Sequence, residues 1–238
     1  MEPLILALPP ASLPVDSSST LAPWLGLLAS YLLGAVPFGF CLAKILRGVD
    51  LREVGSGNIG ATNAMRVLGK PLGLFAFALD FAKGWVPVAW LAPALAGTSL
   101  PGETTWWPVA YGAAAVLGHV FPVYLRFRGG KAVATGAGAL VGLDPLTFLI
   151  AGATWPFVLL TSRMVSLASL IMGVAFPLVA LWRRSEGAVD LPTVVLAAGL
   201  ALLIVVRHRA NVSRILAGTE SRIGSKRSAS PPASSESA

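Results

Sequence analysis

Residues 21–46, LAPWLGLLASYLLGAVPFGFCLAKIL, decide the fold of this chain. They carry no charge before Lys44 and are long enough to cross the core of a bilayer, which takes about 20 apolar residues. The rest of the sequence agrees, because 55% of its 238 residues are hydrophobic and only 12% are charged. A soluble domain averages about 25% charged residues. We therefore predict an all-α integral membrane protein that crosses the bilayer several times.

Outward from this segment, further apolar runs cover residues 72–97, 106–125, 132–161, 165–182 and 191–206. The run 132–161 would be about 45 Å long as a single helix, which is more than the hydrocarbon core needs. The turn signal Gly142-Leu143-Asp144-Pro145 divides it into two short segments that are tilted or partly re-entrant. The prediction is about seven transmembrane or partly re-entrant helices.

The distribution of positive charge sets the orientation, with the N-terminus outside and the C-terminus in the cytoplasm. All but three of the 18 Lys and Arg residues then lie on the cytoplasmic side; Lys83 lies within a span and Arg183 and Arg184 lie outside. This rule explains the net charge of +7 without nucleic-acid binding. We expect residues 1–20 to be an extracytoplasmic segment, residues 21–224 a single transmembrane domain, and residues 225–238 a disordered cytoplasmic tail.

Three polar stretches share the predicted cytoplasmic face, and the first is GSGNIGATNAMR, residues 55–66. Its glycines let the backbone approach an anion, and successive N–H groups can form an anion-binding nest. Hydroxyl and amide side chains add donors, and Arg66 adds a planar fork suited to phosphate. The alternative is a flexible turn between two spans. The candidate binding residues here are Ser56, Asn58, Thr62, Asn63 and Arg66.

The second stretch contains Gly129-Gly130-Lys131, which opens an apolar segment. A helix N-terminus after a glycine pair is a natural anion site, and Lys131 adds a point charge. The alternative is a positively charged anchor with a turn. His119, which lies just before Phe121-Pro122, is interpreted as a structural histidine.

The third stretch is RHRANVSRILAGTESR, residues 207–222, directly after the last span. His208 and Asn211 are three residues apart and share one helical face. His208 could serve as a base or donor, and Asn211 as a donor to an oxyanion or a phosphate. Glu220 is predicted to form a structural ion pair. The alternative for the whole segment is a basic amphipathic anchor on anionic lipid.

Two further features lie within the predicted spans. Asp80 and Lys83 are spaced to pair with each other, and charge at that depth is costly and by default functional. Whether they contact substrate or only join helices is open. Ser166 and Ser169 either donate to a ligand or bond to the preceding turn. The sequence shows no cluster with metal-ligand spacing, so we expect neither a metal nor a cofactor.

Together these stretches, with Leu79-Asp80-x-x-Lys83-Gly84 and Gly118-His119-x-Phe121-Pro122, resemble the motifs of the bacterial acyl-phosphate:glycerol-3-phosphate acyltransferases. The resemblance covers residues 25–224 in order. Two positions depart from the common pattern: Ile59 stands where proline is usual, and Ala132 where glycine is frequent. Neither change removes a polar group.

The resemblance implies an enzyme of the bacterial cytoplasmic (inner) membrane with its active site at the cytoplasmic face. It would transfer an acyl group from acyl phosphate to the 1-hydroxyl of glycerol 3-phosphate, giving lysophosphatidic acid and phosphate. Ser56, Arg66, His208 and Asn211 match residues needed for activity in the family, and Gly129-Gly130-Lys131 matches its glycerol-phosphate site. Glu220 matches a residue tied to structural integrity.

The residues themselves fit this chemistry, because both substrates carry phosphate and the three stretches are rich in cationic donors. To the candidate binding residues we add Ser169, Asp80 and Lys83. The expected partners are the two substrates and membrane lipids, with no nucleic acid, and a monomer is plausible. Two alternatives remain open at this point: a transporter of phosphorylated solutes and a non-catalytic scaffold that binds anionic lipid.

Overall fold

The structure is a computed structural model that describes residues 21–96 and 106–224. Within these ranges it is entirely helical, as the sequence predicts. The predicted N-terminal segment 1–20 and tail 225–238 lie outside the described residues.

The first half of the chain contains a broken first span and a helix that the sequence did not predict. Pro37 separates α1 from α2 with a bend of 42°, because proline lacks the N–H that a continuous helix needs. A short helix, α3, follows the first polar stretch, and the next span continues through a π-helical turn at Pro87–Leu91. The helices are α1 Ala22–Ala35, α2 Phe38–Arg47, α3 Ala61–Leu68, α4 Lys70–Val86 and α5 Ala92–Ala96.

The second half alternates long and short helices. The predicted break in the run 132–161 is confirmed at Asp144, whose side chain accepts the Thr147 N–H and caps the helix that follows. Asp190 caps α11 in the same way through Thr193, and α12 leaves the end of α11 at 60°. The helices are α6 Trp107–Val120, a 3₁₀ turn Val123–Leu125, α7 Val133–Leu143, α8 Pro145–Gly152, α9 Thr154–Ser162, α10 Val165–Ser185, α11 Leu191–Arg207 and α12 Arg209–Leu216.

Among the described residues, four helical stretches are long and apolar enough to cross a membrane, and six if each bent pair is one span. Helix α7 has 11 residues and so measures about 16 Å, well short of a bilayer core of about 30 Å. It fits the short segment expected from the sequence. The count of seven crossings and the orientation of the termini remain predictions.

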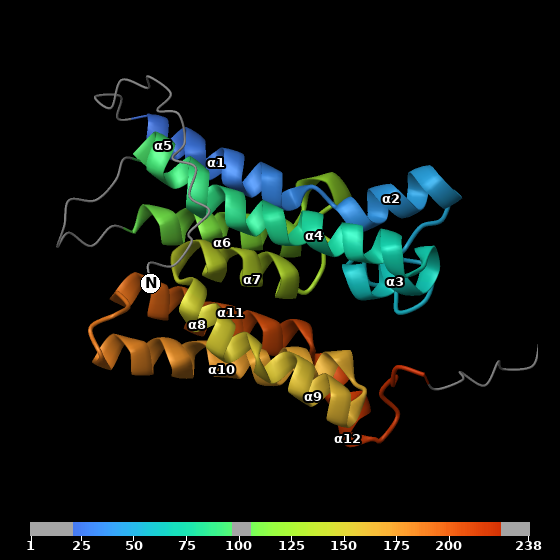
Figure 1. The fold of residues 1–238 in the computed structure, drawn as a ribbon. Coiled ribbons are helices and arrows are strands. Elements are labelled where there is room, and N and C mark those ends of the chain that lie inside the picture. Colours follow the sequence, from blue (N-terminus) through green and yellow to red (C-terminus); the bar gives the residue numbers. More distant parts are fainter. Residues whose placement is uncertain (1–20, 97–105, 225–238) are drawn as a thin grey trace, which may run out of the picture.

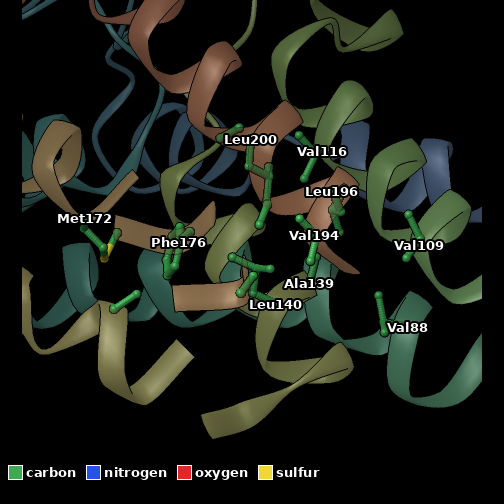
Figure 2. Close-up of a cluster of buried hydrophobic side chains, with 14 of the residues drawn as sticks. Val88, Val109, Val116, Ala139, Leu140, Met172, Phe176, Val194, Leu196 and Leu200 are labelled. Carbon is green, nitrogen blue, oxygen red and sulfur yellow. The ribbon is translucent and has the colours of Figure 1, made fainter. Parts of the chain in front are cut away.

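The helices run side by side along one direction (Figure 1), with α1 packed on α6, α4 on α7, and α10 on both α9 and α11. The α4–α7 contact depends on glycine, because a Cβ atom on Gly138 would overlap the Phe81 carbonyl oxygen and one on Gly84 that of Thr135. Close approach through small residues is typical of helices packed in membranes. Figure 2 shows the apolar core that joins α6, α7, α10 and α11, including Leu140, Phe176 and Leu200.

This arrangement brings different parts of the chain together at the two ends of the bundle. At one end, Arg183 of α10 forms a bidentate ion pair with Asp144, at 2.8 and 3.1 Å. At the opposite end lie α3 and α12 (Figure 1), and the Ile223 N–H donates to the Arg163 carbonyl. The predicted convergence of the three polar stretches occurs at this second end.

Candidate active site

Lys131 lies at the centre of the convergence, where its Nζ donates to Asn211 Oδ1 at 2.6 Å. This bond joins the second polar stretch to the third. The backbone turns sharply at the next residue, since Ala132 has a φ of 63°, in the left-handed region that favours glycine. That conformation explains why glycine is frequent at this position in the family that the sequence resembles.

Glu220 fixes the amide of Asn211 from the other side. Asn211 Nδ2 donates to Glu220 Oε1 at 2.7 Å, and Ser166 Oγ donates to the same oxygen at 2.8 Å. Arg214 Nε donates to Glu220 Oε2 at 2.7 Å, which confirms the predicted ion pair. Because a carboxylate only accepts and an ammonium only donates, the Asn211 amide can take one orientation only.

The Gly129-Gly130 turn is held from two sides. The N–H groups of Gly129 and Gly130 donate to the carbonyls of Val120 and His119, each at 3.1 Å. Their own carbonyls accept from Arg207, Nη2 to Gly129 at 2.8 Å and Nε to Gly130 at 3.1 Å. Because these two amides are used within the protein, they do not contribute to the anion site that the sequence predicts at the helix N-terminus after the glycine pair. The cation of this stretch is Lys131.

The electrostatic surroundings of Lys131 are strongly positive. Burial lowers its pKa to about 8; Glu220 opposes this shift, whereas Arg214, Arg207 and Arg66 add to it. Arg66 of the first stretch thus acts on Lys131 across the site. At neutral pH the ammonium is still largely protonated, and the cluster carries more positive than negative charge. Such a cluster suits a multiply charged anion.

His208 is a neutral histidine with a defined tautomer. Its Nδ1 lies 2.8 Å from the Ile204 carbonyl, and because a carbonyl only accepts, Nδ1 carries the proton and Nε2 keeps a lone pair. Burial, followed by the charge of Lys131, lowers the pKa of His208 to about 4. The side chain is buried beside Asn211 on the third stretch.

The first stretch is shaped by its own asparagines. Asn63 is buried, and its Nδ2 donates to the carbonyls of Leu51 and Val54, each at 3.0 Å, while its Oδ1 accepts the Ser56 N–H at 2.8 Å. Asn58 Oδ1 accepts the Gly60 N–H at 2.8 Å. These two side chains therefore organise the loop. Of the candidate binding residues in this stretch, Ser56 and Arg66 are exposed, and Thr62 is half-buried on α3.

A pocket of about 540 Å³ lies between the first stretch and the glycine turn. Arg52, Arg128 and Arg207 line it together with Glu53. Its other lining residues are Gly57, Ile59, Phe127 and Gly129. The pocket thus reaches the glycine turn that precedes Lys131, and three of its lining residues are cationic.

The remaining candidates lie deeper. Ser169 Oγ donates to the Val165 carbonyl at 2.9 Å and accepts from Trp155 Nε1 at 3.3 Å, so it bonds to the preceding turn. Asp80 and Lys83 are buried and paired at 2.8 Å, and Lys83 also donates to the Val36 carbonyl at 2.8 Å. Their predicted pairing is confirmed, and both lie inside the bundle. The described part of the chain holds no group of three or more His, Cys, Asp or Glu residues placed to bind a metal.

Comparison with known proteins gives one consistent result. A family model described as Glycerol-3-phosphate acyltransferase matches residues 24–218. The glycerol-3-phosphate acyltransferase of Macrococcus caseolyticus is 40% identical over 201 residues, which are 84% of this chain and 97% of the relative. That of Salinibacter ruber is 45% identical over 209 residues, 84% of this chain and 91% of the relative.

Two solved structures share the fold. Both are crystal structures of PlsY, an integral membrane glycerol 3-phosphate acyltransferase, and each match covers 85% of this chain and 96% of that protein. The glycerol 3-phosphate form has a TM-score of 0.76 at 39% identity. The lysophosphatidic acid form has a TM-score of 0.74 at 37% identity.

Proposed function

This chain belongs to the glycerol-3-phosphate acyltransferase family and is an integral membrane acyltransferase, and from that premise we propose its reaction. It transfers a fatty acyl group from acyl phosphate to the 1-hydroxyl of sn-glycerol 3-phosphate. The products are lysophosphatidic acid and inorganic phosphate, in the first acylation step of phospholipid synthesis. The two related structures, in glycerol 3-phosphate and lysophosphatidic acid forms, support the acceptor and the product.

The observation that carries the proposal is the held ammonium of Lys131, fixed by Asn211 and flanked by Arg66, Arg207 and Arg214. Glycerol 3-phosphate and acyl phosphate each carry a phosphate group, and the leaving group is phosphate itself. The reaction therefore needs cations that are in place before substrate binds. The Glu220–Asn211–Lys131 chain meets that need, because each partner is already bonded. Preorganised donors of this kind stabilise developing charge without reorganisation during the reaction.

In the proposed step, the 1-hydroxyl oxygen attacks the acyl carbonyl carbon. A carbon–oxygen ester bond forms, the bond from that carbon to the phosphate oxygen breaks, and phosphate leaves with the electron pair. Acyl phosphate is a mixed anhydride with a good leaving group, so positioning and charge stabilisation are enough to drive the exchange. Lys131 and Arg66 hold phosphate, and Asn211 keeps Lys131 in place.

The proton of the attacking hydroxyl has two possible acceptors, and their basicity separates them. His208 has a pKa of about 4 in the free enzyme, whereas a phosphomonoester loses its second proton, and its dianion accepts one, with a pKa of about 6. A phosphate dianion in water is therefore a stronger base than His208 in the free enzyme. We assign the proton to phosphate, and we assign to the Nε2 lone pair of His208 the orientation of the hydroxyl.

We place the active site at the cytoplasmic face of the bacterial inner membrane, with the N-terminus outside and the C-terminus inside. The positive charge gathered at the α3–α12 end supports this orientation. Substitution of the single cysteine, Cys41→Ser, permits a direct test with Arg126→Cys and Glu186→Cys, both exposed and on loops at opposite ends of the bundle. A membrane-impermeant maleimide should label Glu186→Cys in intact cells and Arg126→Cys only after lysis; the reverse pattern contradicts the orientation.

The donor is tested with purified protein in detergent. Glycerol 3-phosphate is supplied with either acyl phosphate or acyl-CoA of the same chain length, and lysophosphatidic acid is measured by mass spectrometry. We expect product with acyl phosphate and none above background with acyl-CoA. Product from acyl-CoA alone contradicts the proposed donor, and product from neither contradicts the proposed reaction.

A further inference from the structure

His119 occupies a position that the proposed reaction does not use. It lies in the last turn of α6 and is 5% exposed. Its carbonyl accepts the Gly130 N–H at 3.1 Å, and its ring edge lies against the same glycine, since a Cβ atom on Gly130 would overlap Nε2. Both the backbone and the side chain of His119 therefore contact the turn before Lys131.

The other edge of the ring faces the buried ion pair. His119 Nδ1 lies 3.8 Å from Asp80 Oδ1, close to the carboxylate but beyond hydrogen-bond distance, and it has no hydrogen-bond partner among the described residues. Asp80 is paired with Lys83 at 2.8 Å. Lys83 in turn donates to the Val36 carbonyl at 2.8 Å and lies 5.6 Å from the centre of the Phe38 ring. Polar groups thus lie next to one another from the α1–α2 break, through α4, to the glycine turn, although no hydrogen bond joins Asp80 to His119.

On its outer side the same turn is bound by Arg207. His119 contacts Gly130 through its ring and its carbonyl, Arg207 binds the carbonyls of both glycines, and Lys131 is the next residue in the chain. A displacement of about 1 Å in a group that positions substrate can cost about 100-fold in rate. The inner grip is therefore a feature that the reaction can depend on, although His119 itself is buried.

We propose that His119, backed by Asp80 and Lys83, is a positioning residue for acyl transfer that holds the Gly129-Gly130 turn and so places Lys131. The proposal rests on the proposed function. It gives the buried charged pair a role: the pair lies beside the histidine ring, the histidine supports the turn, and the turn presents the ammonium. Substrate contacts Lys131 and not His119.

The pH profile separates positioning from simple structural support. Lys131 is faced by Glu220, Arg66, Arg207, Arg214 and His208. Because burial lowers its pKa to about 8, we expect the alkaline limb of kcat/KM near pH 8. In His119→Ala the turn loses its support and water can reach the Lys131 ammonium, which raises the pKa of Lys131. The alkaline limb therefore moves to higher pH, and kcat/KM at pH 7 falls about 10- to 100-fold because Lys131 is displaced. A variant that only contains less folded protein has a lower kcat/KM at every pH, and its alkaline limb stays at the same pH.

Two variants control the comparison. His119→Gln keeps a polar group near the ring edge that contacts Gly130, and we expect it to recover kcat/KM to within about fivefold of wild type. Tyr111 lies on α6, as His119 does, but away from the glycine turn, and its hydroxyl donates to the Pro23 carbonyl of α1. Tyr111→Phe removes this hydrogen bond. It should lower the melting temperature without moving the limb.

Gly130→Ala approaches the same contact from the turn and keeps the test decisive if His119→Ala does not fold. The added Cβ meets the imidazole and should shift the limb in the same direction, whereas Gly199→Ala, with open space around it, should not. In the double variant His119→Ala/Gly130→Ala we expect losses well below the product of the two single losses. Multiplicative losses, or an unshifted limb in both single variants, overturn the proposal; an inactive wild type instead refutes the proposed function.

Discussion

Glu220→Gln tests the chain that holds Lys131. Its carboxylate is two hydrogen bonds from the ammonium, of 2.7 and 2.6 Å, across the Asn211 amide. At the resulting separation of roughly 7 Å, and with an effective dielectric constant of about 20, an opposite unit charge is worth about 2 kcal/mol. That corresponds to about 1.5 pKa units, and allowance for solvent screening reduces it to about one unit.

Glu220 raises the pKa of Lys131, so its neutralisation lowers that pKa from about 8. The alkaline limb of kcat/KM should move from about pH 8 to about pH 7, because about half of the ammonium is protonated at pH 8 in the wild type and about a tenth in the variant. The expected loss is about fivefold at pH 8 and small at pH 6. The alkaline limb thus moves to lower pH in Glu220→Gln, whereas we expect it to move to higher pH in His119→Ala.

The same variant also loses stability. Glu220 accepts from Ser166, Asn211 and Arg214, and replacing this buried acceptor should cost about 2 kcal/mol, or about 4–8 °C in Tm. The assay is a pH series of kcat/KM beside a melting curve in the same detergent. Glu186→Gln, an exposed acid at the other end of the bundle, is the control and should change neither. An alkaline limb that stays at pH 8 in Glu220→Gln refutes the reasoning.

Two further predictions concern the site and the packing beneath it. His208→Gln should retain at least tenfold more kcat than His208→Ala, because an amide can replace an acceptor that only orients the hydroxyl. An amide cannot replace a general base, which contributes a rate factor of about 10²–10⁴. Equal losses of the two variants in single-turnover kinetics would show that His208 is the base. Gly138→Ala should lower Tm by several degrees, since its Cβ meets the Phe81 carbonyl and overpacking costs about 1–3 kcal/mol. Gly199→Ala is its matched control, and equal melting temperatures for the two variants would contradict the close α4–α7 packing.

Much of the fold follows from local pattern. Long apolar runs located the spans, the turn signal at 142–145 located the α7–α8 break, and the bias of Lys and Arg placed the three polar stretches on one face. The pairings of Asp80 with Lys83 and of Glu220 with a basic neighbour also follow from short spacings. Apart from the bias of Lys and Arg, which runs along the whole chain, each of these features depends on residues close together in the sequence.

The features that sequence reasoning missed depend on contacts between distant segments. Asn63 reads as a phosphate donor but is used up on carbonyls 9 and 12 residues away. The sequence predicts an anion site at the glycine pair, yet the amides of that pair bind the end of α6 and its carbonyls bind Arg207, 77 and 78 residues on. Helix α3 is short and polar, so its sequence does not distinguish it from a loop. The α1–α2 bend does have a signal in the sequence, Pro37, although residues 21–46 are predicted to be one span.

The most direct test of the account is one reaction carried out with the wild type and with Lys131→Met. With acyl phosphate and glycerol 3-phosphate, the purified wild type should release one phosphate for each lysophosphatidic acid formed. Lys131→Met, matched for folded protein by its melting curve, should be slower by about 100-fold or more, since it removes the charge that preorganises the site. Undiminished turnover in Lys131→Met, or lysophosphatidic acid formed by the wild type without equal release of phosphate, would contradict the account.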